Sequence, residues 1–190
     1  MVDENHAATS SDKRLREAAV GHPLSFEAHF QLGNALRDGG DYDGATAAFS
    51  AARDLQPESA AAWSSLGTAY ALGGRIDEAI AAHQRAVALE PHAAALRFNL
   101  ANTLRLAGNR TEAEREFRES IRLDPRLVAA YNNLGTLLLD CGDVAGSRRQ
   151  FADALRWDPA HANAASNALF SMHYDAGVTV AEIAEAHAAW

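Results

Sequence analysis

The fold is decided by one stretch of sequence, residues 63–91, which reads WSSLGTAYALGGRIDEAIAAHQRAVALEP. Its apolar residues recur at helical spacing on both sides of the pair Gly73-Gly74. This pattern predicts two helices joined by a tight turn, because glycine adopts the left-handed conformation that such a turn needs. Pro91 then ends the second helix, since proline cannot continue one. The stretch therefore predicts one helix–turn–helix unit.

The same pattern returns along the whole sequence with a period of 34 residues. All prolines of the chain stand at this interval: Pro23, Pro57, Pro91, Pro125 and Pro159. Four glycines share it: Gly40, Gly74, Gly108 and Gly142. A single unit of this kind cannot bury its own apolar face, so the units must stack on one another to form a core.

The residues of the quoted stretch resemble the signature of the tetratricopeptide repeat family: Trp63-x-x-Leu66-Gly67-x-x-Tyr70, then Ala79, Ala86 and Pro91. The resemblance implies an all-α fold, a right-handed α-α superhelix (solenoid) of tetratricopeptide repeats. One residue departs from its counterparts: His83 stands where the other repeats carry Phe. We interpret it as a half-buried packing residue.

The period divides the chain into repeats at residues 26–59, 60–93, 94–127 and 128–161, with a partial fifth repeat and a C-terminal capping or junction helix at 162–190. Residues 11–25 match the second helix of a preceding unit and are predicted to form an N-terminal capping helix. Residues 1–10 are predicted to be disordered.

Composition limits the classes of partner. The formal net charge of -8 disfavours nucleic acid and anionic membrane surfaces, both of which need clustered Lys and Arg. Cys141 is the only cysteine, and the polar start of the sequence lacks the apolar core of a signal peptide. We therefore expect a cytoplasmic protein.

Stacked repeats present their first helices along one long wall, and the ligand that fits such a wall is an extended polypeptide. The position before the Leu-Gly pair belongs to this wall and carries an asparagine in three successive repeats: Asn99, Asn133 and Asn167. An amide offers both a donor and an acceptor, so it can pair with a peptide backbone. The alternative is that each asparagine only satisfies the backbone of a neighbouring helix.

Flanking wall positions add Asn34 and Asn102, and one turn further along Arg37 and Arg105. These arginines either contact carboxylates or carbonyls of a ligand, or are solvated surface residues. One tetratricopeptide subclass clamps the C-terminal carboxylate of chaperones with Lys and Arg. The corresponding slots here are Ala95 and Asn99, and the lack of a cation argues against that activity.

The C-terminal segment resembles the junction between repeats and catalytic domain in bacterial O-linked N-acetylglucosamine transferase-like proteins. The matching residues are Asn167, Leu169, Phe170, Tyr174, Asp175, Ala184, Glu185, His187 and Trp190. The resemblance implies that Asn99, Asn133 and Asn167 recruit an acceptor polypeptide. Thr179 and Glu182 have the spacing of a capping box that opens a last helix. Either Trp190 folds back as a cap on the fourth repeat, or the chain is a piece of a longer protein in which this residue packed against further protein.

No motif for catalysis stands out in this sequence. The eight histidines show no recurring metal-ligand spacing, so we predict no metal, no cofactor and no catalytic residue. The predicted function is to bind a protein or peptide, as the substrate-recruiting part of an O-GlcNAc transferase-like glycosyltransferase. The alternative is a free-standing adaptor that assembles complexes or self-associates through its C-terminal end.

Overall fold

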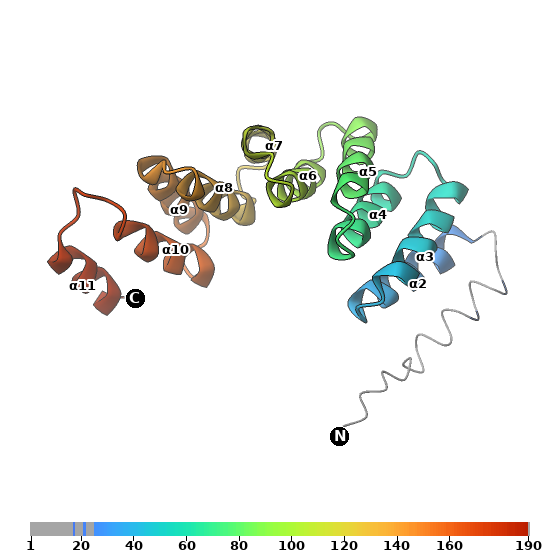
Figure 1. Cartoon of the computed structure of the whole chain (residues 1–190), viewed down its shortest axis with the longest axis horizontal. Coiled ribbons are helices and arrows are strands. Elements are labelled where there is room, and N and C mark those ends of the chain that lie inside the picture. Colours follow the sequence, from blue (N-terminus) through green and yellow to red (C-terminus); the bar gives the residue numbers. More distant parts are fainter. Residues whose placement is uncertain (1–16, 18–20, 22–24, 190) are drawn as a thin grey trace, which may run out of the picture. The chain divides into compact units, whose positions relative to one another are not determined.

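The structure, a computed structural model, describes Glu17, Gly21 and residues 25–189 (Figure 1). The ordered elements in residues 25–189 are all helices. Most of the predicted capping helix at 11–25, all of the predicted disordered segment at 1–10, and Trp190 lie outside the described residues. The sequence-based prediction of an all-α fold is confirmed for the described part of the chain.

The helices follow one another in antiparallel pairs, each a first and a second helix of a repeat. The bounds of the first helices are α2 Phe26–Asp38, α4 Ala60–Leu72, α6 Ala94–Leu106, α8 Val128–Asp140 and α10 Ala162–Met172. The second helices are α3 Tyr42–Leu55, α5 Ile76–Leu89, α7 Arg110–Leu123, α9 Val144–Trp157 and α11 Val180–Ala189.

The chain divides into two compact units, residues 1–91 and 92–190, and each is described by itself. In the first unit α2 packs on α3, α4 packs on α5, and α4 also contacts α2 and α3. In the second unit α8 contacts α6 and α10, so that the first helices of three repeats adjoin one another. Of the predicted asparagines, Asn99, Asn102, Asn133 and Asn167 lie on this row of first helices.

The turns between paired helices are built as the sequence predicts. Gly40, Gly74, Gly108 and Gly142 have φ angles of 81°, 78°, 79° and 82°, in the left-handed region. Side chains such as those of Ser59 and Asp143 cap the following helix by accepting a backbone N–H three residues on. The glycine turn recurs at the same place in the first four repeats, whereas α5, α6, α7 and α8 begin without a side-chain cap.

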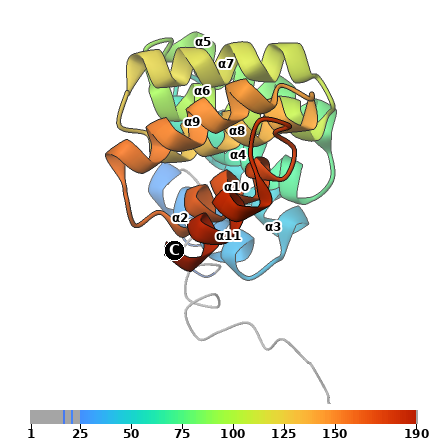
Figure 2. The ribbon, with the colours of Figure 1, turned by 90° about the vertical axis from the view of Figure 1, so that its left-hand side faces the viewer.

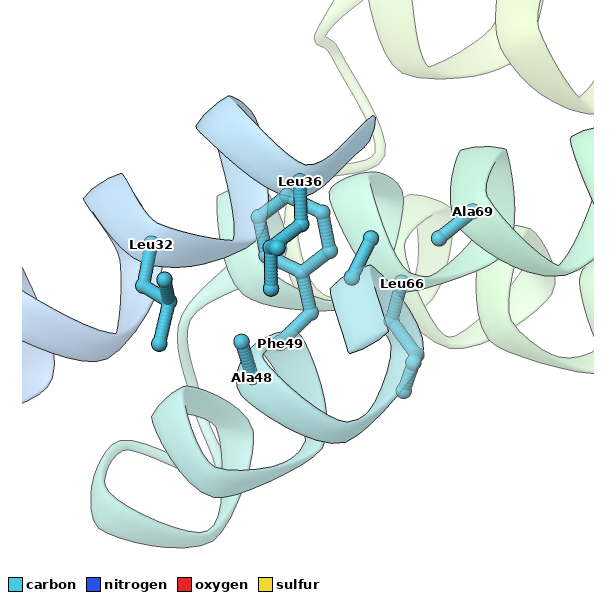
Figure 3. Packing of buried hydrophobic residues seen from close by; sticks show 7 residues of the cluster. Leu32, Leu36, Ala48, Phe49, Leu66 and Ala69 are labelled. Carbon is cyan, nitrogen blue, oxygen red and sulfur yellow. The ribbon is translucent and has the colours of Figure 1, made fainter. Parts of the chain in front are cut away.

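In the first, second and fourth repeats an aromatic ring of the second helix lies against a glycine of the first, and in the third repeat Ala101 stands at the glycine position. In the first repeat Phe49 is fully buried between Leu36, Leu66 and the backbone of Gly33 (Figure 3). A Cβ atom at Gly33 would lie 2.7 Å from the ring, so the absence of a side chain there permits the close approach. His83 fills the equivalent slot in the second repeat. We predicted it to be half-buried, and this is wrong: it is only 2% exposed.

The C-terminal end of the second unit contains an ion pair and a capping box. Arg148 of α9 pairs with Asp175, in the turn between α10 and α11. The predicted capping box is confirmed: Glu182 N donates to Thr179 Oγ1 at 3.3 Å, and Thr179 N donates to Glu182 Oε2 at 2.7 Å. Helix α11 contacts α10 (Figure 2).

Candidate functional site

Four asparagines on the first helices of the second unit are joined by hydrogen bonds between their side chains. Asn167 of α10 donates its Nδ2 to Oδ1 of Asn132 on α8, at 2.9 Å. Asn132 donates to its neighbour Asn133 at 3.3 Å, and Asn133 donates to Asn102 of α6 at 2.7 Å. We call Asn102, Asn132, Asn133 and Asn167 the asparagine network. It links three successive repeats.

The network brings together three residues that the sequence singled out, Asn102, Asn133 and Asn167. In the described structure these amides bond to one another and not to helix backbone, and their role in binding a peptide stays a prediction. The fourth member, Asn132, was missed by sequence reasoning. The sequence feature that could have revealed Asn132 is the pair Asn132-Asn133, which places two amides at adjacent positions of one helix.

The amides of the network keep hydrogen-bonding capacity for a ligand. All four residues are half-buried, so part of each remains open to solvent. An asparagine side chain has two N–H donors and a carbonyl oxygen with two lone pairs. Each internal bond uses one donor and one lone pair. The bonds between neighbours therefore fix the orientation of the amides without exhausting them.

Asn99 lies on α6 one turn before Asn102 and is also half-buried. Its backbone carbonyl accepts a hydrogen bond from Thr103 Oγ1 at 3.0 Å. Because residues three apart lie on the same side of a helix, Asn99 extends the row of amides along α6.

The other predicted residues, Asn34 and Arg37, belong to the first unit and lie on α2. Asn34 is half-buried. Arg37 donates through Nε and Nη2 to the carboxylate of Asp38, at 3.0 and 2.9 Å. The charge of Arg37 is therefore already balanced by its neighbour in sequence.

Arg105 differs from Arg37, although both stand at the same position of their repeats. It lies on α6, three residues after Asn102, and is half-buried. Its Nε atom is buried with no hydrogen-bond partner, and no carboxylate among the described residues forms an ion pair with it. Arg105 is thus an uncompensated cation beside one end of the asparagine network.

A cavity of about 420 Å³ on α6 and α7 holds a second polar cluster that sequence reasoning missed: Arg97, Arg115, Glu116, Arg118, Glu119 and Arg122. Arg97 stands where other repeats carry Trp63 or Tyr131, and it pairs at 2.8 Å with Glu116, which is 5% exposed. The other three arginines also pair with glutamates. Because every arginine of the cluster has a carboxylate partner, with Glu116 shared by Arg97 and Arg115, we assign the cluster a structural role.

The described residues contain no group of three or more His, Cys, Asp or Glu side chains that is arranged to hold a metal. The rings of His173 and His187 lie 5.9 Å apart, and both residues are exposed. Cys141 is exposed in the turn after α8. Within the described part of the chain, every helix is too short or too polar to span a membrane.

MamA, YrrB and TTC0263 are three of the solved structures that share this fold. MamA has a TM-score of 0.72 and 24% identity, covering 80% of this chain and 89% of the other. YrrB, described as a TPR protein with an unusual peptide-binding site, has a TM-score of 0.68 and 20% identity, with 95% and 90% covered. TTC0263, a TPR protein of Thermus thermophilus, has a TM-score of 0.73 and 18% identity, with 86% and 89% covered.

A search among curated proteins finds no match. The family model described as tetratricopeptide repeat matches four overlapping stretches: residues 11–52, 30–94, 73–128 and 98–168. Together these stretches span most of the sequence, and they agree with the helix pairs and glycine turns described above. The chain therefore belongs to the tetratricopeptide repeat family.

Proposed function

We propose that the second unit binds an extended polypeptide along its row of first helices, through the asparagine network. Tetratricopeptide repeats are protein-interaction modules, and their surfaces suit extended ligands. The observation that carries the proposal is the set of three amide–amide hydrogen bonds that spans α6, α8 and α10. These bonds fix four half-buried amides on one face before any ligand arrives.

Pre-fixed amides favour binding because less side-chain freedom is lost when the ligand docks. A free N–H of each amide can donate to a backbone carbonyl of the ligand, and the amide oxygen can accept from a backbone N–H. Backbone contacts of this kind depend little on the sequence of the ligand. Asn99 adds one further amide on α6 in the same row.

The test is the joint replacement of Asn99, Asn133 and Asn167 by alanine. Twelve-residue peptides selected on the full chain from a random display library serve as probes, and their Kd values are measured by fluorescence anisotropy. The triple variant is expected to bind them at least about tenfold more weakly, the loss of roughly one net hydrogen bond or more. Unchanged Kd values would overturn the proposal.

Two controls accompany this test. Asn163 is exposed on α10 and is not a member of the network, so Asn163→Ala is expected to bind normally. Circular dichroism checks that the triple variant remains helical. A modest loss of thermal stability is expected, because Asn133 and Asn167 each donate a hydrogen bond to another helix.

We propose further that the bound polypeptide is the acceptor of an O-GlcNAc transferase-like glycosyltransferase. The support is the resemblance of residues 167–190 to the junction that precedes the catalytic domain in such proteins. The gene sequence past the codon for Trp190 tests the idea. An α/β nucleotide-sugar-binding pattern there would support it, and a stop codon would contradict it.

A free-standing adaptor that self-associates through its C-terminal end is the second candidate. The observation in its favour is a pair of exposed aromatic rings, Phe170 and Tyr174, at 53% and 57% exposure with centroids 5.2 Å apart. Exposed apolar surface of this kind favours protein contacts. Sedimentation at several protein concentrations distinguishes the adaptor from the glycosyltransferase arm. An apparent mass that rises with concentration in the wild type, but not in Phe170→Ser, supports the adaptor.

A further inference from the structure

The asparagine network has a direction. Its three hydrogen bonds all donate toward α6: Asn167 to Asn132, Asn132 to Asn133, and Asn133 to Asn102. The last member, Asn102, receives a bond on its oxygen, and its amino group has no partner among the described residues. The α6 end of the network is therefore rich in donors.

Arg105 stands at this same end. It follows Asn102 by three residues on α6, and side chains at that spacing lie about 5–6 Å apart at Cβ on one side of a helix. Its guanidinium offers up to five further N–H donors and a full positive charge. Within the described structure this charge has no carboxylate partner, and its buried Nε has no hydrogen bond.

The Nη groups of Arg105 are not among the buried atoms of the described structure, so an acceptor from a ligand can reach the guanidinium through them. A carboxylate is the acceptor that suits a guanidinium best, because its two oxygens match two parallel N–H groups and its charge is opposite. The amino group of Asn102 is one more donor for the same ligand group.

We infer that Asn102 and Arg105 form a subsite for an acidic side chain, Asp or Glu, of the polypeptide bound along the asparagine network. The inference rests on the proposed function and adds to it a preference at one position of the ligand. The protein as a whole carries a net charge of -8, which repels acidic peptides in general. A polypeptide whose carboxylate lies against α6 is therefore expected to bind more tightly than one whose acidic residues lie elsewhere.

The test uses two soluble peptides of alternating Gly and Ser that differ at one central residue, Glu in one and Gln in the other. Each is titrated into the ¹⁵N-labelled full chain, and the Nε–Hε resonance of Arg105 is followed. The resonance is identified by its loss in Arg105→Gln. The Glu peptide is expected to bind about fivefold more tightly than the Gln peptide, and higher salt should narrow the difference.

The variants decide whether Arg105 is responsible. Arg105→Gln is expected to abolish the preference for Glu, and Arg105→Lys to retain part of it, because lysine keeps the charge but loses the paired N–H groups. Arg37→Gln is the matched control, since Arg37 occupies the same position of its repeat and already pairs with Asp38. It should leave the preference intact.

Three outcomes count against the inference. Equal Kd values for the two peptides, or a preference that survives in Arg105→Gln, would overturn the acidic subsite and leave polypeptide binding standing. If neither peptide shifts the resonance of any side-chain amide of the asparagine network, both the acidic subsite and the proposed polypeptide binding are contradicted.

Discussion

The imidazole of His83 packs directly on the backbone of Gly67. A Cβ atom at Gly67 would lie 2.9 Å from each of three ring atoms. Phe49 and Phe151 lie closer still to the corresponding positions of Gly33 and Gly135, at 2.7 and 2.6 Å, so His83 occupies a slot that holds a phenyl ring elsewhere. Its Nδ1 is buried without a hydrogen-bond partner among the described residues. Burial lowers the pKa of His83 to about 4, from an ordinary value of 6.5.

Acidification is therefore expected to destabilise the first unit. The unfolded chain takes up a proton at His83 near pH 6.5, whereas the folded chain does so only near pH 4. The contribution of a neutral His83 to stability is complete above pH 6.5 and is lost as the pH falls toward 4. Over the whole window the loss is about 3 kcal/mol. Urea unfolding at a series of pH values, followed by circular dichroism, measures it.

Replacing His83 by phenylalanine is expected to remove this pH dependence. The variant should also gain about 1–2 kcal/mol at neutral pH, because a buried polar atom without a partner is eliminated. His92 is exposed, so His92→Gln serves as a control that keeps the wild-type pH profile. A pH profile in His83→Phe as steep as that of the wild type would show that other groups cause it.

Gly135→Ala is expected to destabilise the second unit. A Cβ atom there would lie 2.6 Å from the ring of Phe151. Because the core is closely packed, the helix backbone and the ring can separate only by disturbing their neighbours. The expected cost is about 2 kcal/mol. Phe151→Leu shortens the opposing side chain, so the double variant should cost less than the sum of the two single changes. Strict additivity in a double-mutant cycle would contradict this contact.

Two buried serines are expected to respond in opposite ways to alanine. Ser147 has no hydrogen-bond partner for its Oγ in the described structure, so Ser147→Ala should raise stability by about 1 kcal/mol. Ser120 donates to the carbonyl of Ala94 at 2.8 Å, and Ser120→Ala should lower stability by a similar amount. Thermal unfolding of the two variants side by side provides the measurement. Equal effects would mean that the hydrogen bond of Ser120 contributes nothing.

The helix pairs and their turns could be predicted from sequence because their signals are local and repeated. Gly74 and Pro91 act on the backbone at their own positions, and the same residues return every 34 positions. The depth at which a side chain is buried does not follow from the period alone. The repeat shows which slot His83 occupies, but only the packing of neighbouring helices shows that it is 2% exposed.

The candidate site could be predicted in part, for a similar reason. The period aligns Asn133 with Asn167, but their bonding partners Asn102 and Asn132 lie 31 and 35 residues away and depend on side-chain directions across helices. The difference between the two arginines of the wall had a local signal. The arginine of the first repeat is followed directly by Asp38, which pairs with it. Arg105 is followed by a leucine, so it has no carboxylate at the next position.

The ion pair between Arg148 and Asp175 is expected to hold the last helix, α11, against α10. The backbone N–H of Gly177 and then the guanidinium of Arg148 keep the pKa of Asp175 below its ordinary value of 3.8. The carboxylate is therefore charged at neutral pH, and the ion pair would be lost only as the pH falls below that value. Removing either partner should free α11, because its contacts with other described helices are with α10 alone.

Hydrogen exchange measured by mass spectrometry on the full chain tests this expectation. Arg148→Gln and Asp175→Asn should both speed exchange in Val180–Ala189 several-fold, because the turn before α11 loses its anchor on α9. Exchange in α8 and in the rest of α9 should stay unchanged. Arg149→Gln is the matched control, since Arg149 is the adjacent residue and is exposed. If α11 exchanges at the wild-type rate in both variants, the ion pair does not position this helix, and the capping box at its start must suffice.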